Sequence, residues 1–362
     1  MFRGPLPTAF CYYERWESGT VAIRKVRVED AVGMVLGHDI TKIVPGVYKG
    51  PAFKKGHIIR AEDITHLKDI GKEHIFLIEM IPGQVHENEA VARIARAVAG
   101  PGVVLGEPAE GRVNLKADAA GLLKVDRAAI TAVNGVEHAV LSTLHGNRVV
   151  QAGEILAGIK VVPLVVEADT VETVESIAAA NPGMISVLPM RNLKLAAVIT
   201  GNEVFHGRIA DRFAPVFADK TARYGATLLG VTYQPDDRDL IAGSILEYKR
   251  QGADVIVASG GMSVDPDDVT PDAIRSTGAE LVSYGTPVLP GAMFMLAYLG
   301  DTAIMGMPAC GMYAKTTVFD LLLPRVLAGE RLTKGDIAAL GYGGLCHSCR
   351  ECCYPHCPFG KA

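Results

Sequence analysis

The residues best suited to chemistry stand at the C-terminus, in the segment LCHSCRECCYPHCPFGKA at 345–362. This segment holds five of the seven cysteines of the chain, namely Cys346, Cys349, Cys352, Cys353 and Cys357. Thiolates at such short gaps suit a tetrahedral Zn²⁺ site. The gaps of two residues, with a proline after the last cysteine, are also close to the run that holds iron–sulfur clusters. No second cluster motif accompanies them, so the segment predicts zinc ahead of an iron–sulfur cluster.

We expect four of these thiolates to bind one metal ion, with Cys353 as a spare or alternative ligand. Unligated clustered thiols would be prone to oxidation, and a metal can replace the hydrophobic core that so short a tail lacks. Glycines at 341, 343 and 344 predict a flexible neck. The tail should therefore form a separate small unit, with Tyr354 and Phe359 packed on the metal-bound knob, and its removal should leave the rest of the chain folded.

A second set of chemically capable residues lies in four loops rich in glycine and aspartate. Their sequences are TGNEVFHG, QPDDRD, SGGMSVDPDD and GMPACGM. Each loop follows a short apolar run and precedes a stretch of helical spacing, and this alternation predicts a parallel sheet covered by helices on both faces. Ligands of such sheets bind outside the carboxyl ends of the strands. There, glycines let backbone amides approach a phosphate, and helix N-termini favour anions.

The same loops carry a resemblance to a known family. SGGMSVDPDDVTPDA resembles the Gly-Gly-Thr-Gly-x-x-x-x-Asp-Val-Thr-Pro loop of the molybdopterin-binding domain, which occurs in molybdopterin adenylyltransferases, in molybdenum insertases such as the insertase half of gephyrin, and in CinA-like proteins. TGNEVFHGRIADRF, YQPDDRDLI and GMPACGMYAKTTVFDLLLPRVL are similar to three further motifs of this family, in the family's order. The resemblance covers residues 191–330.

The resemblance implies a three-layer α/β/α domain with a mostly parallel sheet. It also implies molybdopterin or adenylylated molybdopterin as the ligand, with Mg²⁺ as a further cofactor. Asp236 and Asp268 stand where the adenylyltransferases carry two acids, so they are the implied catalytic residues. The other implied ligand-binding residues are Thr200, Gly201, Asn202, Glu203, Asp237, Ser259, Gly260, Gly261, Ser263, Thr270 and Pro308.

Three departures from the family pattern concern catalysis. Leu289 and Ala292 replace the two lysines of the insertase motif Lys-Pro-Gly-Lys-Pro, and Ala309-Cys310-Gly311 replaces Gly-Asn-Pro. In the third, the adenylyltransferase Gly-Thr-Gly loop has become Gly-Met-Ser. A phosphoryl-handling site without those cations lacks its main electrostatic stabilisers, so the resemblance implies a ligand class more strongly than an activity.

Two functions of different classes follow. The first is an enzyme of molybdenum cofactor biosynthesis, a molybdopterin molybdenumtransferase or adenylyltransferase. The second is a non-catalytic molybdopterin carrier or sensor that docks on a molybdoenzyme. A nucleotide-processing enzyme of the CinA kind is a third, more remote alternative. Since members of the family are often dimers or trimers, a homo-oligomer is expected.

Composition bounds these alternatives and suggests an organisation. The chain has a net charge of −4, whereas a dedicated nucleic-acid binder carries an excess of basic residues. No apolar run is long enough to span a membrane. The first residues lack the apolar core of a signal peptide, which predicts a cytoplasmic protein with reduced thiols. We expect a disordered extension at 1–21, two α+β regions at 22–80 and 81–190, the molybdopterin-binding domain at 191–330 and the cysteine-rich metal-binding tail at 331–362.

Overall fold

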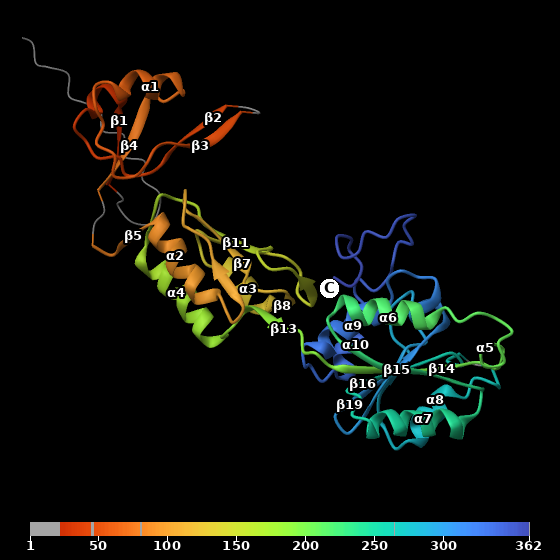
Figure 1. The fold of residues 1–362 in the computed structure, drawn as a ribbon. Coiled ribbons are helices and arrows are strands. Elements are labelled where there is room, and N and C mark those ends of the chain that lie inside the picture. The colour runs from red at the N-terminus through yellow and green to blue at the C-terminus, as the bar shows by residue number, and fades with distance from the viewer. Residues whose placement is uncertain (1–21, 45–46, 80–81, 264, 362) are drawn as a thin grey trace, which may run out of the picture. The chain divides into compact units, whose positions relative to one another are not determined.

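The structure, a computed structural model, describes residues 22–44, 47–79, 82–263 and 265–361 (Figure 1). The extension predicted at 1–21 lies outside these residues. The described chain forms two compact units. The first contains residues up to 116 together with 126–144 and 155–185, and the second contains 117–125, 145–154 and the residues from 186 onward. The five-part division that we expect from the sequence stays a prediction.

The N-terminal part of the first unit is a mixed α+β fold. Its elements are β1 (Ala22–Arg27), η1 (Val28–Ala31), β2 (Ile40–Val44), β3 (Tyr48–Phe53), α1 (Asp63–Asp69) and β4 (His74–Glu79). Strand β1 pairs antiparallel with β4, and β2 pairs antiparallel with β3. Val28, Leu36 and Leu67 are fully buried in a common core, and this small core holds the region together.

The remainder of the first unit surrounds a four-stranded sheet of order β6-β7-β11-β9. Its elements are β5 (Gln84–His86), α2 (Glu87–Val98), β6 (Val103–Leu105), β7 (Arg112–Ala117), α3 (Arg127–Asn134), β9 (Ala139–Thr143), β11 (Ile155–Val161), β12 (Val165–Glu167) and α4 (Ala168–Ala180). Helix α2 buries the apolar stripe that its helical spacing predicts, including Val91, Ile94 and Val98. The guanidinium of Arg93 on α2 binds both carboxylate oxygens of Glu175 on α4, at 2.9 and 2.6 Å.

The second unit contains the domain that carries the four loops. Its elements are β8 (Gly121–Val125), β10 (Arg148–Val150), β13 (Ile185–Pro189), β14 (Lys194–Thr200), α5 (Asn202–Phe205), α6 (Phe213–Arg223), β15 (Thr227–Gln234), α7 (Arg238–Arg250), β16 (Val255–Ser259), α8 (Thr270–Ser276), β17 (Glu280–Tyr284), β18 (Met295–Leu299), β19 (Thr302–Met307), η2 (Ala309–Met312), α9 (Val318–Leu327) and α10 (Lys334–Ala339). Strands β8, β10 and β13 form a small sheet of their own.

The main sheet has six strands in the order β15-β14-β16-β19-β18-β17. Strands β15, β14, β16 and β19 are parallel, whereas β18 runs antiparallel to both of its neighbours. Helices α6, α9 and α10 cover one face, and α7 and α8 cover the other (Figure 1). Alternate residues of β14 enter the two cores, because successive side chains of a strand point to opposite faces. The predicted three-layer fold is therefore confirmed.

The last long helix begins later than the sequence pattern predicts. We expect one helix over 310–329, but the structure has the short 3₁₀ helix η2 followed by α9. Helix α9 begins after Thr317, whose side chain accepts a hydrogen bond from the amide of Phe319, while the carboxylate of Asp320 accepts one from the amide of Thr317. This reciprocal capping box fixes the start of the helix.

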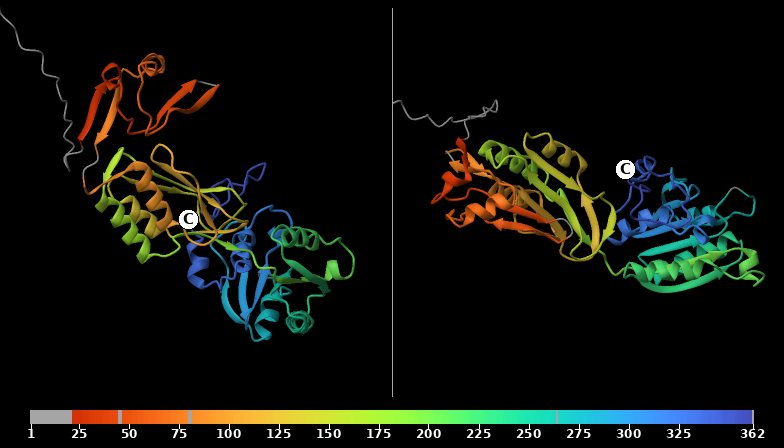
Figure 2. Two further views of the ribbon diagram at one scale, coloured as in Figure 1. Left: turned by 60° about the vertical axis from the view of Figure 1, so that its left-hand side comes forward. Right: turned by 90° about the horizontal axis from the view of Figure 1, so that it is seen from above.

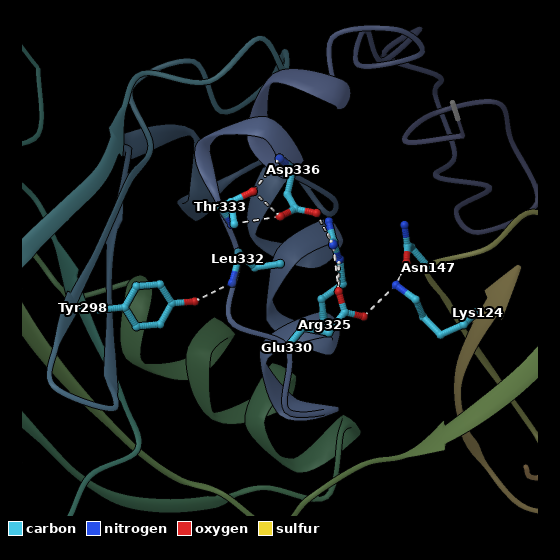
Figure 3. A network of polar contacts seen from close by, with 8 residues as sticks. All are labelled: Lys124, Asn147, Tyr298, Arg325, Glu330, Leu332, Thr333 and Asp336. Carbon is cyan, nitrogen blue, oxygen red and sulfur yellow. Dashed lines mark hydrogen bonds and ion pairs between the residues drawn. The ribbon is translucent and has the colours of Figure 1, made fainter. Parts of the chain in front are cut away.

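A network of charged side chains holds α9 and α10 to the strands β8 and β10 (Figure 3). The guanidinium of Arg325, which is buried, donates to Glu330 at 2.7 Å and to Asp336 at 2.6 Å. Lys124 donates to Glu330 at 2.7 Å and to Asn147 at 2.6 Å. Two segments from the middle of the sequence are thereby fixed to the second unit.

The cysteine-rich tail packs on the domain, so the prediction of a separate knob on a flexible neck is wrong. Phe359 is 2% exposed and belongs to the same core as β14, α6 and α9. Leu345 forms a parallel bridge with Leu289, and the amide of Gly360 donates to the carbonyl of Gly343 at 2.9 Å. The neck is fixed because its glycines permit close backbone contacts. A Cβ on residue 344 would lie 2.4 Å from the carbonyl oxygen of Leu340.

Within the part of the chain that the structure describes, no helix has the length and apolar character needed to cross a bilayer.

Candidate functional site

The four predicted loops meet at one edge of the main sheet. In the parallel register, Thr200 at the end of β14 lies beside Gln234 of β15, while Ser259 at the end of β16 lies beside Met307 of β19. Ile199 pairs with Ser259, so all four strands end at the same level. The structure thus brings together the predicted ligand-binding loops, at the edge where parallel sheets bind their ligands. We call this edge, with its loops 200–203, 234–237, 259–263 with 265–268, and 307–310, the loop edge.

The loop after β16 turns on two glycines that no other residue could replace without strain. Gly260 and Gly261 have φ angles of +95° and +54°. A Cβ on residue 260 would lie 2.2 Å from the carbonyl oxygen of Thr200, and one on residue 261 would lie 3.0 Å from Oγ1 of Thr270. The loop therefore touches the end of β14 and the start of α8.

Hydroxyl groups lie beneath this turn. Thr200 and Thr270 are buried, and their Oγ1 atoms are 3.1 Å apart in a hydrogen bond. Ser259 is 3% exposed, and its Oγ has no hydrogen-bond partner among the described residues. The two threonines fasten the loops to one another, whereas the serine hydroxyl stays available at the base of the loop edge.

A residue that the sequence analysis misses supports the loop from the side. The hydroxyl of Tyr284, at the end of β17, donates to the backbone carbonyls of Met262 at 2.9 Å and of Ser263 at 3.1 Å. The guanidinium of Arg275 lies over the ring of Tyr284, 5.5 Å from its centroid. Burial raises the pKa of Tyr284, so the hydroxyl remains a donor. In the sequence, the only feature that indicates this supporting role for Tyr284 is its position at the end of a strand.

Asp236 joins two of the loops. Its Oδ2 accepts the amide of Asn202 at 2.9 Å, and its own amide donates to the side chain of Asn202 at 3.4 Å. Partial burial raises the pKa of Asp236 above its ordinary value, the amide of Asn202 lowers it, and the nearby carboxylates of Glu203, Asp268 and Asp267 raise it further.

Other predicted site residues have structural tasks of their own. Asp237 caps α7, because its Oδ1 accepts the amides of Asp239 at 2.9 Å and of Leu240 at 3.0 Å. Asp268 closes a turn by accepting the amide of Asp265 at 3.1 Å. Pro308 precedes η2 and accepts the amide of Gly311 at 2.9 Å through its carbonyl. Each residue still lies at the loop edge.

Beneath the loop edge lies a narrow apolar cavity with one charged residue in its wall. Ile199, Phe213 and Met307 are among the residues that line it, together with Lys220 of α6. The ammonium of Lys220 binds the carboxylate of Asp320, and both side chains are nearly fully buried, at 5% and 3% exposure. The same ammonium donates to the carbonyl of Lys315 at 3.3 Å. This pair is an unpredicted feature, since the two residues are far apart in the sequence.

Leu289 and Ala292, where the family resemblance implies lysines, lie in the loop between β17 and β18. Strand β17 runs in the same direction as β19, because both pair antiparallel with β18. The loop that contains Leu289 and Ala292 therefore leaves the sheet at the loop edge. Leu289 is 54% exposed and is the residue with which the tail forms its bridge. Burial raises the pKa of the Cys310 thiol on η2.

The tail cysteines do not converge in the structure. Cys346 and Cys357 are half-buried, while Cys349, Cys352 and Cys353 are exposed and free. Among the described residues, no group of three or more His, Cys, Asp or Glu side chains is arranged to hold a metal ion. The hydroxyl of Thr316 and a backbone amide lower the pKa of the Cys352 thiol, against a smaller effect of burial.

Two family models match the chain. One, a domain of unknown function, covers residues 25–79, and the other, described as the probable molybdopterin binding domain, covers 196–328. Among curated proteins, a CinA-like protein of Mycobacterium tuberculosis is 40% identical over 86 residues, which are 24% of this chain and 20% of that protein. A CinA-like protein of Mycobacterium avium is 37% identical over the same length. The chain thus spans about a fifth of the length of these curated relatives.

Solved structures that match part of the chain include the molybdopterin biosynthesis enzyme MoaB from Thermus thermophilus. That match has 19% identity and a TM-score of 0.32, and it covers 38% of this chain and 98% of that one. Another is CinA from Thermoplasma acidophilum, at 16% identity and a TM-score of 0.29, covering 33% of this chain and 89% of that one. The family assignment rests on the sequence match and on the motifs of the four loops. Residues 196–328 of this chain belong to the molybdopterin-binding domain family.

Proposed function

We propose that the chain binds molybdopterin, or its adenylylated form, at the loop edge and acts in molybdenum cofactor biosynthesis or delivery. The observation that carries the proposal is the meeting of four family loops around Gly260 and Gly261. The backbone at Gly260 approaches Thr200 more closely than a side chain would allow, and the backbone at Gly261 lies close to the hydroxyl of Thr270. A pterin with a phosphate fits such an edge, because glycine backbones and helix N-termini offer amide donors to an anion.

Each part of the edge has a distinct task in this proposal. Gly260, Gly261 and Ser263 shape the loop that cradles the pterin, and Tyr284 holds that loop in place. The unpaired hydroxyl of Ser259 is free to bind a polar group of the ligand. Thr200 and Thr270, also implied ligand-binding residues, hold the loops to one another through their hydrogen bond.

The acidic residues are assigned to a cation. The carboxylates of Asp236, Glu203 and Asp268 would hold Mg²⁺, which has the charge to offset a phosphate beside these acids. The donors are oxygen atoms alone, which a hard cation prefers, but in the structure these described carboxylates are not grouped to hold one. Without a cation, the same carboxylates would repel an anionic ligand, so we expect binding to depend on magnesium.

Replacement of these acids tests the assignment. Asp236→Asn and Asp268→Asn keep an oxygen acceptor for the loop amides but remove the charge. We expect each to weaken magnesium-dependent molybdopterin binding by about tenfold to a hundredfold, since hydrogen bonds and contacts of charged groups are worth about 1.5–3 kcal/mol. Asp219→Asn, on the exposed surface of α6, is the matched control and should bind as the wild type does. The measurement is an anaerobic fluorescence titration with and without Mg²⁺, and equal affinities for all four proteins would refute the assignment.

We further propose that the chain carries molybdopterin and has little catalytic activity. Leu289 and Ala292 leave the loop edge without the two lysines that the insertases use, and removal of one such stabilising group costs about a hundredfold to a thousandfold in rate. We expect no measurable molybdate insertion, and no ATP consumption with molybdopterin and Mg²⁺. Robust turnover in either assay would instead support the enzyme of cofactor synthesis. A carrier must deliver its ligand to another protein, and we propose a molybdoenzyme as that partner. We also propose that the chain forms a homo-oligomer.

A further inference from the structure

We propose that His86 makes a proton-sensitive contact within the first unit. The neutral ring joins the segment around Gly37 to the start of α2, and protonation of the ring releases it. His86 is the last residue of β5 and the N-cap of α2, and it is 3% exposed. We call its two ring hydrogen bonds the His86 contact. The inference does not depend on the proposed function, because it concerns the first unit alone.

The two partners of the ring determine which nitrogen carries the hydrogen. Nε2 lies 2.9 Å from the backbone carbonyl oxygen of Gly37. A carbonyl oxygen can only accept, so Nε2 must donate. Nδ1 lies 3.2 Å from the backbone amide of Asn88. An amide can only donate, so Nδ1 must accept. Both hydrogen bonds therefore require the neutral ring with its hydrogen on Nε2.

Protonation breaks this arrangement at a defined atom. The added proton can bind only at Nδ1, where it would face the N–H group of Asn88. The hydrogen bond that caps α2 is then replaced by a repulsion between two donors. The imidazolium would also be buried, which is costly for a charged group. Turning the ring out to water relieves both costs, and it breaks the bond to Gly37 as well.

The His86 contact joins two parts of the first unit that are each fixed by their own packing. Gly37 follows Leu36, which is fully buried in the core of the N-terminal part. Helix α2 packs along α4, and the left view of Figure 2 shows the orange α2 beside the green α4. The hydroxyl of Thr41 also binds the carboxylate of Glu110, but this pair is exposed, where water competes for both groups.

The surroundings of His86 favour the neutral ring. Burial has the largest effect and lowers the pKa of His86, while the hydrogen bond to the Gly37 carbonyl raises it. The charged and titratable side chains that act on the ring are Lys55, which lowers this pKa, Asp39 and Glu89, which raise it, and His38. Because the pKa in the folded chain lies below the ordinary value, the neutral ring stabilises the fold above that value. This stabilisation is lost as the pH falls through the lowered pKa.

The neighbouring Glu87 responds to pH in the opposite direction. It is 5% exposed, and burial raises its pKa. Its carboxylate therefore takes up a proton more readily in the folded chain than in the unfolded one, which favours the fold as the pH falls. Global stability would combine the two effects, so the test must be read at His86 and at the start of α2.

Replacement of the ring by a cap that does not titrate tests the proposal. His86→Asn supplies a side-chain oxygen that can cap α2 at every pH. In the wild-type full chain, we expect hydrogen exchange at the start of α2 to rise about fivefold to thirtyfold between about pH 7.5 and pH 5, after correction for the intrinsic rate. This is the factor that corresponds to the loss of a helix cap. The His86→Asn variant should show no such rise.

His57→Asn is the matched control, because His57 is a histidine of the same unit whose Nε2 binds Asp63 at 2.6 Å. This variant should keep the rise in exchange. Nuclear magnetic resonance of the wild-type ring nitrogens gives a second measurement, which does not require a variant to fold. We expect the hydrogen of His86 on Nε2 at neutral pH, and proton uptake at Nδ1 in acid together with the faster exchange of α2.

Three results would overturn the proposal. An equal pH dependence of exchange in the wild type and in His86→Asn would show that His86 does not control the start of α2. A hydrogen on Nδ1 at neutral pH would contradict the assigned hydrogen bonds. Loss of the pH effect in His57→Asn would assign the sensitivity to a different histidine.

Discussion

Phe359→Ala should lower the free energy of unfolding of the second unit by about 3–5 kcal/mol, the usual cost of removing a buried aromatic side chain. Phe359 is 2% exposed and lies in the core that contains Leu321 and Leu322 of α9. Its ring also meets that of Tyr354 edge to face, with the centroids 6.4 Å apart. The cavity left by alanine could not close easily, because Gly360 is already pressed against Leu321.

The matched control is Tyr342→Ala, at an aromatic residue of the same tail that is 79% exposed. We expect a change within about 0.5 kcal/mol for this variant. Denaturant unfolding followed by circular dichroism, with a chelator present to remove any contribution from metal, gives both values. If Phe359→Ala unfolds at the same denaturant concentration as the wild type, the tail is not part of the core and the packing described above is incorrect.

Lys220→Met should destabilise the same unit by about 3–5 kcal/mol, since breaking a buried ion pair leaves an uncompensated charge. The carboxylate of Asp320 would remain 3% exposed. It would keep only the amide of Thr317, at 2.8 Å, and its weaker contact with the hydroxyl of the same residue. The double variant Lys220→Met with Asp320→Asn should lose less than the sum of the two single variants, because it removes both charges together.

Arg223→Met is the control for this prediction. Arg223 lies on the same helix, α6, and forms an ion pair with Asp219 at 3.0 Å, but both side chains are more than half exposed. Pairs of this kind contribute about 0.2–1 kcal/mol. Equal and small losses for Lys220→Met and Arg223→Met in thermal and denaturant unfolding would show that the buried pair is not essential to the fold.

The sequence predicts the part of the site that depends on local pattern. Apolar runs followed by glycine and aspartate indicate strand ends, and the parallel-sheet rule then places Thr200, Asp236 and Gly260 at one edge. Thr317 and Asp320 also have the spacing of a capping box, which indicates the start of α9. The overall pattern nevertheless predicts too early a start for this helix, because the preceding residues, from Cys310 onward, have helical spacing as well.

The remaining features depend on contacts between distant residues, which no local pattern encodes. The hydroxyl of Tyr284 reaches the loop after β16 only because β17 joins the same sheet as its edge strand, beyond β19 and β18. Lys220 and Asp320 meet only when α6 packs against α9. The sequence predicts that Phe359 belongs to a separate tail, but in the folded chain its side chain is buried in the core of the domain. In each case, tertiary packing decides the role of the residue.

The most direct test of the account is the equilibrium binding of molybdopterin to the wild-type full chain, measured without oxygen and in the presence of Mg²⁺. Circular dichroism of the same preparation would first establish that the chain is folded. We predict saturable binding of one ligand per chain, with a dissociation constant of about 1 μM or lower, which corresponds to about −8 kcal/mol. A folded chain that shows no saturable binding of molybdopterin or its adenylylated form would contradict the proposed function.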